Sequence, residues 1–223
     1  MVLKSDETII SADYHTGGEP FRIVDIGPME GTTVLDRRSW AEENLDDVRK
    51  FLINEPRGHA DMYGGFVVPA DDRHGDLGVV FFHKDGFSTA CGHGTIALVT
   101  WAIDSGLIEP KDEVVTVIVD VPSGRLVTEA KVHNQKVESV CFQNVPSFVS
   151  ATNISLQTSV GQVNADISFG GAFYASVNAG KLGLSPTASN IDALISLGRE
   201  IKDQLKDNQS AVHPDDDRLS GVY

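Results

Sequence analysis

The stretch from Gly92 to Ser105 constrains the fold more than any other part of the sequence. Its residues Ile96, Val99 and Ile103 recur at spacings of three and four, which predicts a buried helix, and Gly106 is a natural C-terminal stop. Short segments typical of strands lie on both sides of it. A chain of mostly short strands with long helices between them favours an α+β architecture in which curved sheets wrap a helix.

The remaining elements follow from alternation, turns and amphipathic spacing. We expect strands at 8–13, 20–26, 64–70, 76–83, 114–124, 125–132, 137–145, 163–171 and 172–179. Two amphipathic helices are predicted at 36–53, with Asp36 as a candidate cap, and at 190–206, with Asn190 as the cap. Their apolar stripes are expected to be Trp40, Leu45, Val48, Phe51 and Leu52, and Ile191, Leu194, Ile195, Ile201 and Leu205. The last residues, "LSGVY", resemble the beginning of a strand.

Charge and cysteine content exclude several functional classes. The 223 residues include 18 basic and 32 acidic side chains, giving a net charge of −14. An acidic protein repels phosphate backbones and has no attraction to an acidic membrane surface, so neither nucleic acid nor membrane is expected as a partner. Two cysteines make neither a disulfide framework nor a Cys-rich zinc site. The opening residues reach Lys4, Asp6 and Glu7 before any apolar run, so we expect a cytoplasmic protein without a signal peptide.

Cys91 stands in "FSTACGHGTIA", where the buried helix is predicted to begin. A cysteine acts as a base or nucleophile only as a thiolate. The unpaired N–H groups and the dipole of a first helical turn favour an anion there, and Gly92 and Gly94 let a ligand approach the backbone. With His93 as a titratable neighbour, this pattern predicts a lowered thiol pKa and a cradle for a carboxylate. The alternative is a small buried cysteine at a helix start.

Three other groups of residues are weaker candidates. Cys141 lies mid-strand between Val140 and Phe142, which predicts a buried, inert thiol. The segment "ADYHTGGEP" carries Asp13, His15 and Glu19 around a glycine turn. The segment "NEPRGHADMYGG" carries Glu55, Arg57, His59, Asp61 and Tyr63. Taken alone, each segment is better explained as a turn held by side-chain hydrogen bonds, but their presence beside "ACGHGT" favours a catalytic chain.

Together, "DYHTGGEPFRIV", "NEPRGHADMYGGF" and "GFSTACGHGTIALV" resemble the proline racemase family, which includes racemases, 4-hydroxyproline 2-epimerases and trans-3-hydroxy-L-proline dehydratases. "VESVCFQNVPSFV", "DISFGGAFYASV" and "HPDDDRLSGVY" match as well, so the resemblance covers nearly the whole chain. It implies a diaminopimelate-epimerase-like α+β fold, in which two similar lobes each wrap a curved sheet around a central helix. We expect residues 1–133 to form the first lobe and 134–223 an incomplete second lobe.

The resemblance also implies roles for individual residues. Cys91 falls on a catalytic position at the start of the first central helix, where it removes the α-proton of a proline-like substrate. Gly92 and His93 fall on positions that hold the substrate carboxylate and line the pocket, and Tyr63 on an aromatic position that flanks the bound ring. The family uses no cofactor and no metal, and its members are often dimeric, so a homodimer is an expectation here.

The form of the motifs favours one branch of the family. "HTGGEPFRIV" and "EPRGHADMYGG" are closest to the dehydratases, which implies dehydration of trans-3-hydroxy-L-proline to Δ1-pyrroline-2-carboxylate. Proline racemase and 4-hydroxyproline 2-epimerase remain the alternatives.

The family's second catalytic segment, of the type Ser-Pro-Cys-Gly-Thr-Gly-Thr with threonine replacing the cysteine in the dehydratases, does not occur in this chain. We therefore expect a C-terminally truncated member. The further alternative is an inactive remnant that binds a ligand or dimerises.

Overall fold

The computed structural model describes residues 8–223, which divide into two compact units, one ending at Val145 and one running from Pro146 to Tyr223. Lys4, Asp6 and Glu7, on which the signal-peptide expectation rests, lie outside the described residues. The boundary lies after Val145 rather than after residue 133, because strand β7 (Lys136–Gln143) pairs antiparallel with β6 (Gly124–His133).

A seven-stranded sheet in the order β1-β2-β3-β4-β5-β6-β7 forms the first unit. The other strands are β1 (Ser11–Thr16), β2 (Glu19–Val24), β3 (Gly64–Val68), β4 (Leu77–Phe82) and β5 (Val114–Val121). The β2–β3 and β4–β5 pairs are parallel, and the other pairs are antiparallel. These strands confirm those expected from the sequence, with end points shifted by a few residues.

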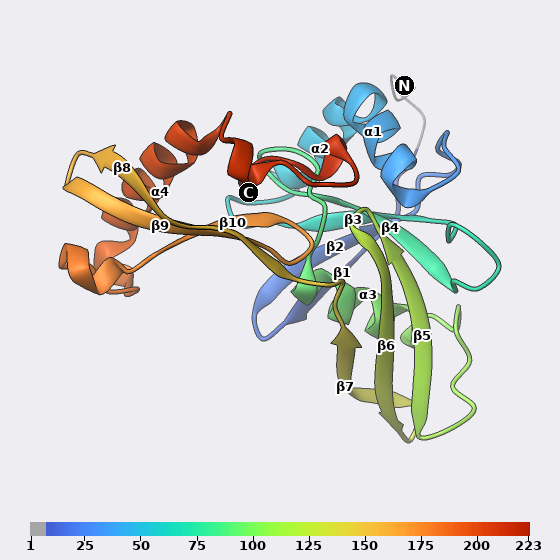
Figure 1. Ribbon diagram of the computed structural model, residues 1–223. Coiled ribbons are helices and arrows are strands. Elements are labelled where there is room, and N and C mark those ends of the chain that lie inside the picture. The colour runs from blue at the N-terminus through green and yellow to red at the C-terminus, as the bar shows by residue number, and fades with distance from the viewer. Residues whose placement is uncertain (1–7) are drawn as a thin grey trace. The chain divides into compact units, whose positions relative to one another are not determined.

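Helix α3 (Gly92–Asp104) is the buried helix that the sequence predicts. It contacts β1 and β2 at one edge of the sheet and β6 and β7 at the other. Since β1 and β7 are the two edge strands, the sheet must curve around α3, as Figure 1 shows for the green helix and the strands beside it. Gly106, at φ +76°, follows the end of the helix as expected.

Two helices rather than one occupy the region predicted as helix 36–53. Helix α1 (Val34–Asn44) and helix α2 (Asp46–Ile53) are separated at Leu45, whose φ and ψ of −122° and 10° leave the helical region. The N-cap of α1 is Thr33, not Asp36 as predicted. Asp36 occupies the N3 position, where its side chain completes the capping box. Leu45 is fully buried, so the break places its side chain in the core.

Helices on both faces explain the composition of β4. Helix α1 contacts β4 and β5, and α3 lies inside the curved sheet. All six residues of β4 are buried, and they form a continuous apolar run rather than an alternating one. On one face Phe82 packs on Phe66 with ring centroids 4.5 Å apart, and on the other Phe81 meets Phe21 at 6.0 Å.

The second unit contains a three-stranded antiparallel sheet in the order β10-β9-β8 and one α-helix. Its elements are β8 (Phe148–Thr158), β9 (Gly161–Phe169), β10 (Phe173–Val177), α4 (Ile191–Leu205) and the short 3₁₀ turns Ala179–Leu182, Ala188–Asn190, Gln209–Ala211 and Asp217–Leu219. The prediction that the last residues begin a strand is confirmed in part. Val222 forms a parallel bridge to Phe173, and the Tyr223 N–H donates to the Phe173 carbonyl at 2.8 Å.

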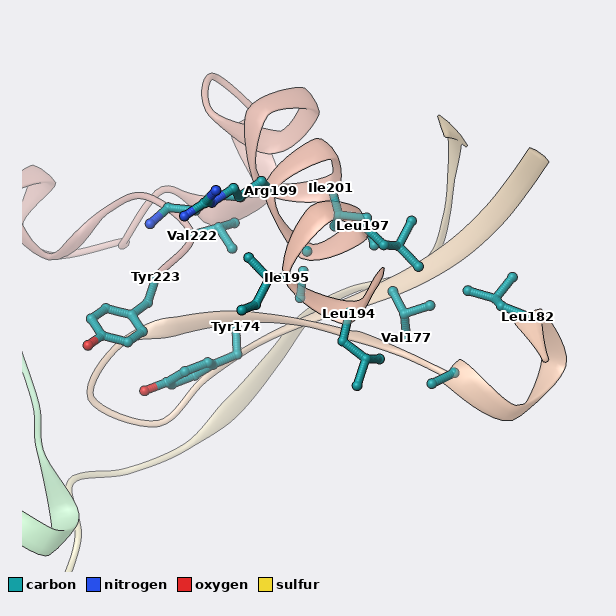
Figure 2. Close-up of a pocket in the computed structure, with 14 residues that line it drawn as sticks. Tyr174, Val177, Leu182, Leu194, Ile195, Leu197, Arg199, Ile201, Val222 and Tyr223 are labelled. Carbon is teal, nitrogen blue, oxygen red and sulfur yellow. The ribbon is translucent and has the colours of Figure 1, made fainter. Parts of the chain in front are cut away.

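The predicted stripe of α4 is only partly buried. Leu197, Ile201 and Leu205 pack inward, whereas Ile191 and Ile195 are exposed. Ile195 and Leu194 instead line an apolar cavity of about 430 Å³, together with Tyr174, Val222 and Tyr223 (Figure 2). The predicted Asn190 cap makes no side-chain capping bond.

Arg22 joins three segments of the first unit. Its guanidinium forms two bonds to the Asp13 carboxylate, at 2.8 and 2.7 Å, and donates to the carbonyls of Leu52 and Arg57 at 2.6 and 2.7 Å. The side chain is almost fully buried. It therefore ties β1 and β2 to the end of α2 and to the loop that leads to Tyr63.

Replacing Arg22 with methionine should destabilise the first unit by about 1 to 3 kcal/mol, because the buried Leu52 carbonyl, the partly buried Arg57 carbonyl and the Asp13 carboxylate lose their donor. Both tryptophans, Trp40 and Trp101, lie in this unit, so tryptophan fluorescence during urea unfolding measures the effect. Lys50→Met, which removes an exposed pair with Asp46 in the same unit, is the control and should cost at most about 1 kcal/mol. Equal losses for the two variants would contradict this role of Arg22.

Candidate active site

Cys91 is the N-cap residue of α3, the position predicted from the sequence. Its backbone is extended, and its carbonyl accepts the first helical bond from the Thr95 N–H at 3.0 Å. The sulfur accepts a bond from the Gly94 N–H at 3.3 Å, and the residue as a whole is 9% exposed. The thiol is therefore held at the start of the helix with only a small part open to solvent.

The backbone after Cys91 offers hydrogen-bond donors to a ligand. Helix geometry leaves the first N–H groups of α3, those of Gly92 and His93, without a carbonyl acceptor inside the helix. Gly92 is exposed, and a Cβ placed there would meet only the Phe142 ring, at 3.4 Å. A carboxylate can approach these groups, where the helix dipole also favours negative charge.

Gly94 has a different role from Gly92. A Cβ on Gly94 would lie 2.4 Å from the Phe21 ring and 2.8 Å from the Cys91 sulfur, both far inside van der Waals contact. The absence of a side chain at this position lets β2 pack directly against the first turn of α3. The two glycines that the sequence marked together thus serve separately, one for ligand access and one for packing.

Burial reverses the predicted change in the thiol pKa. Loss of solvation raises the pKa of Cys91 to about 12, and the nearby negative charge of Glu19 adds to the effect. Hydrogen bonds from the Gly94 N–H and the Tyr63 side chain act in the opposite direction but are outweighed. The prediction of a lowered pKa is therefore wrong for the protein without ligand, since desolvation exceeds the effect of the helix terminus.

The His93 ring lies against the thiol, within hydrogen-bonding distance of the sulfur. Both ring nitrogens are nearly equidistant from the sulfur, Nδ1 at 3.6 Å and Nε2 at 3.7 Å. Desolvation lowers the pKa of His93, partly offset by Glu19, so the ring is neutral at neutral pH. A neutral imidazole in this orientation lines the site, but it supplies no positive charge to a thiolate.

Tyr63 completes an aromatic wall beside Cys91. Its ring meets that of His93 edge to face, with centroids 5.3 Å apart, and stacks on Phe21 at 6.3 Å. Its hydroxyl hydrogen-bonds to the buried Ser88 hydroxyl. The structure thus brings together the four residues that the sequence singled out: Cys91, Gly92, His93 and Tyr63.

The first turn segment contributes in part to this site. The Thr16 hydroxyl donates to the His93 carbonyl at 2.9 Å, and Glu19 acts electrostatically on Cys91 and His93. Asp13 is instead paired with Arg22, and His15 accepts a bond from the Gly18 N–H within the turn.

In the second segment, only Tyr63 is placed at the site by its contacts. Glu55, Arg57, His59 and Asp61 are exposed. Arg57 lies over the ring of Phe51, 3.7 Å from its centroid, and Phe51 is itself exposed rather than buried as predicted. His59 accepts from the Asp61 N–H at 3.3 Å, as expected for a turn held by its own side chains.

Cys141 does not have the predicted surroundings. It lies in the middle of β7 as expected, but it is exposed. Strand β7 is an edge strand, and Phe142 is the residue whose ring approaches Gly92 of α3. Because neighbouring residues of a strand face opposite ways, Cys141 points away from that helix.

Among residues 8–223, no group of three or more His, Cys, Asp or Glu side chains could hold a metal ion. Within the same residues, no helix combines the length and apolar character needed to cross a membrane.

Alanine substitutions at the two glycines should separate packing from access. Gly94→Ala should destabilise the first unit by about 1 to 3 kcal/mol, because the new methyl group overlaps Phe21 and the sulfur. Gly92→Ala should leave stability nearly unchanged, because its Cβ makes only ordinary contact. Urea unfolding followed by tryptophan fluorescence measures both, and a greater loss for Gly92→Ala would contradict the assignment.

Comparison with known proteins identifies the family of this chain. A family model described as proline racemase matches residues 11–223. Trans-3-hydroxy-L-proline dehydratase of Bacillus thuringiensis subsp. konkukian is 39% identical over 99% of this chain and 67% of its own length. The Colwellia psychrerythraea enzyme of the same name is 42% identical over 97% of the chain and 62% of its own length. The chain spans about two thirds of the length of such relatives.

Solved structures match equally well. A hydroxyproline epimerase from Agrobacterium vitis with bound trans-4-hydroxy-L-proline superposes with a TM-score of 0.90 at 28% identity, covering 96% of this chain and 63% of that one. A probable proline racemase from Agrobacterium radiobacter K84 also gives 0.90, at 29% identity over 96% of this chain and 65% of that one. These likenesses confirm the expected α+β, diaminopimelate-epimerase-like fold. This chain belongs to the proline racemase family.

Proposed function

We propose that this chain provides the Cys91 half of a cofactor-independent enzyme that dehydrates trans-3-hydroxy-L-proline. The observation that carries the proposal is the Cys91 thiol at the N-cap of α3, next to helix N–H groups that a carboxylate can reach. Relatives that bear the name of this dehydratase support the choice of reaction.

The first unit suits the removal of an α-proton next to a carboxylate. The Cα–H of an amino acid is a very weak acid, so the site must stabilise developing negative charge while a nearby base takes the proton. In our proposal the N–H groups of Gly92 and His93 bind the carboxylate, and the Tyr63 ring flanks the five-membered ring. The Cys91 sulfur then lies beside Cα.

In the proposed reaction, the Cys91 thiolate takes the α-proton and becomes a thiol. The electron pair of the broken C–H bond forms a double bond between Cα and C3, while the C3–O bond breaks. The hydroxyl takes a proton from solvent and leaves as water, and the Cys91 thiol returns its proton to solvent before the next turnover. The resulting enamine tautomerises to Δ1-pyrroline-2-carboxylate, so no redox cofactor and no metal are required.

Proline racemase and 4-hydroxyproline 2-epimerase activities are the alternatives. They share the α-proton removal and differ in that a proton returns to the opposite face of Cα. The structural match to a hydroxyproline epimerase supports this alternative, while the more similar dehydratase sequences favour the first reading.

Turnover should depend on Cys91 and be selective for trans-3-hydroxy-L-proline. We would assay the chain alone, and the chain joined to the C-terminal third of the Bacillus thuringiensis relative, on this compound, on proline and on 4-hydroxyproline. Cys91→Ser should lower kcat about 10²- to 10⁴-fold, because the serine hydroxyl is a poor base. Cys141→Ser is the matched control and should remain active. Racemised proline without water loss would overturn the dehydratase reading, and an active Cys91→Ser variant would overturn the site.

A second candidate function, self-association or ligand binding without turnover, is favoured by the apolar cavity of the second unit. Tyr174, Ile195 and Tyr223, which line this cavity, are each more than 40% exposed. Clustered exposed apolar side chains of this kind mark interaction surfaces.

If this surface mediates self-association, the chain should dimerise in light scattering coupled to gel filtration. Ile195→Asp should raise the dimer dissociation constant at least about tenfold, because it places a charge in the apolar contact. Val160→Asp, at an exposed residue outside the cavity lining, is the control. A monomer at every concentration would rule out the dimer.

A further inference from the structure

We propose that Phe142 is a specificity-determining residue, whose ring contacts the ring of a bound substrate next to its carboxylate. It thereby favours cyclic carboxylates, such as five-membered-ring amino acids, over small acyclic ones. This selection rests on the proposed function, in which the first turn of α3 holds the carboxylate, but it does not depend on proton transfer. It can therefore be tested with ligands that cannot react.

Phe142 lies on the side of β7 that faces α3. It pairs with Thr128 of β6, and paired residues of neighbouring strands present their side chains on the same face of a sheet. Thr128 is fully buried, and its hydroxyl donates to the Val117 carbonyl at 2.8 Å. Cys141, the preceding residue of β7, is exposed on the opposite face. The pairing of β6 with β7 therefore directs the Phe142 ring toward the helix.

The absence of a side chain on Gly92 leaves space beside the Phe142 ring. A Cβ placed on Gly92 would lie 3.4 Å from one atom of the ring and 3.9 Å from another, which is ordinary van der Waals contact. A ligand atom in the same space would meet the ring at a similar distance. Phe142 is only partly buried although it faces the helix, so part of its ring is open to such a contact.

The position of the Phe142 ring determines which part of a ligand it meets. Gly92 is the first residue of α3, and its N–H is one of the two proposed carboxylate donors. Atoms bonded to a carboxylate held there must also lie close to Gly92, within reach of the ring. In trans-3-hydroxy-L-proline these are Cα and the ring atoms that follow it, whereas acetate has a single methyl carbon. Contact with the larger apolar surface gives the higher affinity.

Tyr63 and Phe142 approach the first turn of α3 from different parts of the sheet. Tyr63 is the residue before β3, a central strand, and its ring meets the His93 ring with centroids 5.3 Å apart. Phe142 comes from β7, an edge strand, and approaches Gly92. Each of the two consecutive residues that hold the carboxylate in our proposal thus has an aromatic neighbour. A ligand that spans both N–H groups can contact both rings.

The test is an NMR titration of the whole chain with cyclopentanecarboxylate and with acetate, followed at the amide signals of Gly92 and His93. Each ligand carries one carboxylate and no amine, so the difference between them is the ring. Phe142→Ala should raise the dissociation constant of cyclopentanecarboxylate about five- to tenfold, and should change that of acetate less than about twofold. Phe51→Ala, which removes an exposed ring on α2 in the same unit, is the control and should leave both constants unchanged.

Phe142→Leu provides a second variant, which tests the same point if alanine prevents folding. Because leucine keeps part of the apolar contact, it should raise the dissociation constant of cyclopentanecarboxylate about two- to threefold and leave that of acetate unchanged.

Equal losses for the two ligands in either variant would overturn the proposal, because they would show that Phe142 only holds the first turn in place. Unchanged constants for both ligands would overturn it as well. So would an unmodified chain in which the Gly92 and His93 signals respond to neither ligand. Turnover of trans-3-hydroxy-L-proline and its loss in Cys91→Ser are separate measurements, so the proposed reaction can fail while this selection is observed, and the reverse.

Discussion

The close contact between β2 and the first turn of α3 is the constraint on which the first unit depends. Gly94 has no side chain, so the Phe21 ring packs directly against the helix beside the Cys91 sulfur. This contact positions the start of α3 inside the curved sheet and determines where the thiol lies. It also excludes water, and exclusion of water is what raises the pKa of Cys91.

The burial that positions the thiol therefore lowers its reactivity. The burial that holds the sulfur in place favours the neutral thiol, whereas proton removal requires the thiolate. The groups that favour ionisation are the Gly94 N–H and the Tyr63 side chain. Polar groups at the sulfur are thus as important to the proposed chemistry as the cysteine itself, and both come from the first unit.

The sequence predicted those features that depend on local pattern. The apolar spacing of α3 and the glycines around Cys91 are local signals, and both the helix and the N-cap position are confirmed. The predicted direction of the Cys91 pKa shift was wrong, because that direction depends on how deeply the sulfur is buried by β2. The prediction that Cys141 is buried was wrong for a similar reason, since only the strand order shows that β7 is an edge strand.

Other features had weak signals or none. Ser88 and Thr16 lie within motifs that the sequence marked, but their partners, Tyr63 and the His93 carbonyl, are distant in the chain. Strand β8 went unpredicted because register shifts and Asn153, at φ +60°, interrupt its alternation. The break at Leu45 leaves the helical pattern of 36–53 almost intact, so only the buried position of that side chain explains it.

We propose that the first turn of α3 binds the carboxylate of a proline-like substrate beside Cys91. NMR of the backbone amides and aromatic rings of this chain, titrated with trans-3-hydroxy-L-proline, tests this binding site. We predict that the N–H signals of Gly92 and His93 shift most, together with the ring signals of Tyr63. If those signals stay unchanged while others saturate, for example those of residues around the cavity of the second unit, the site has been placed wrongly.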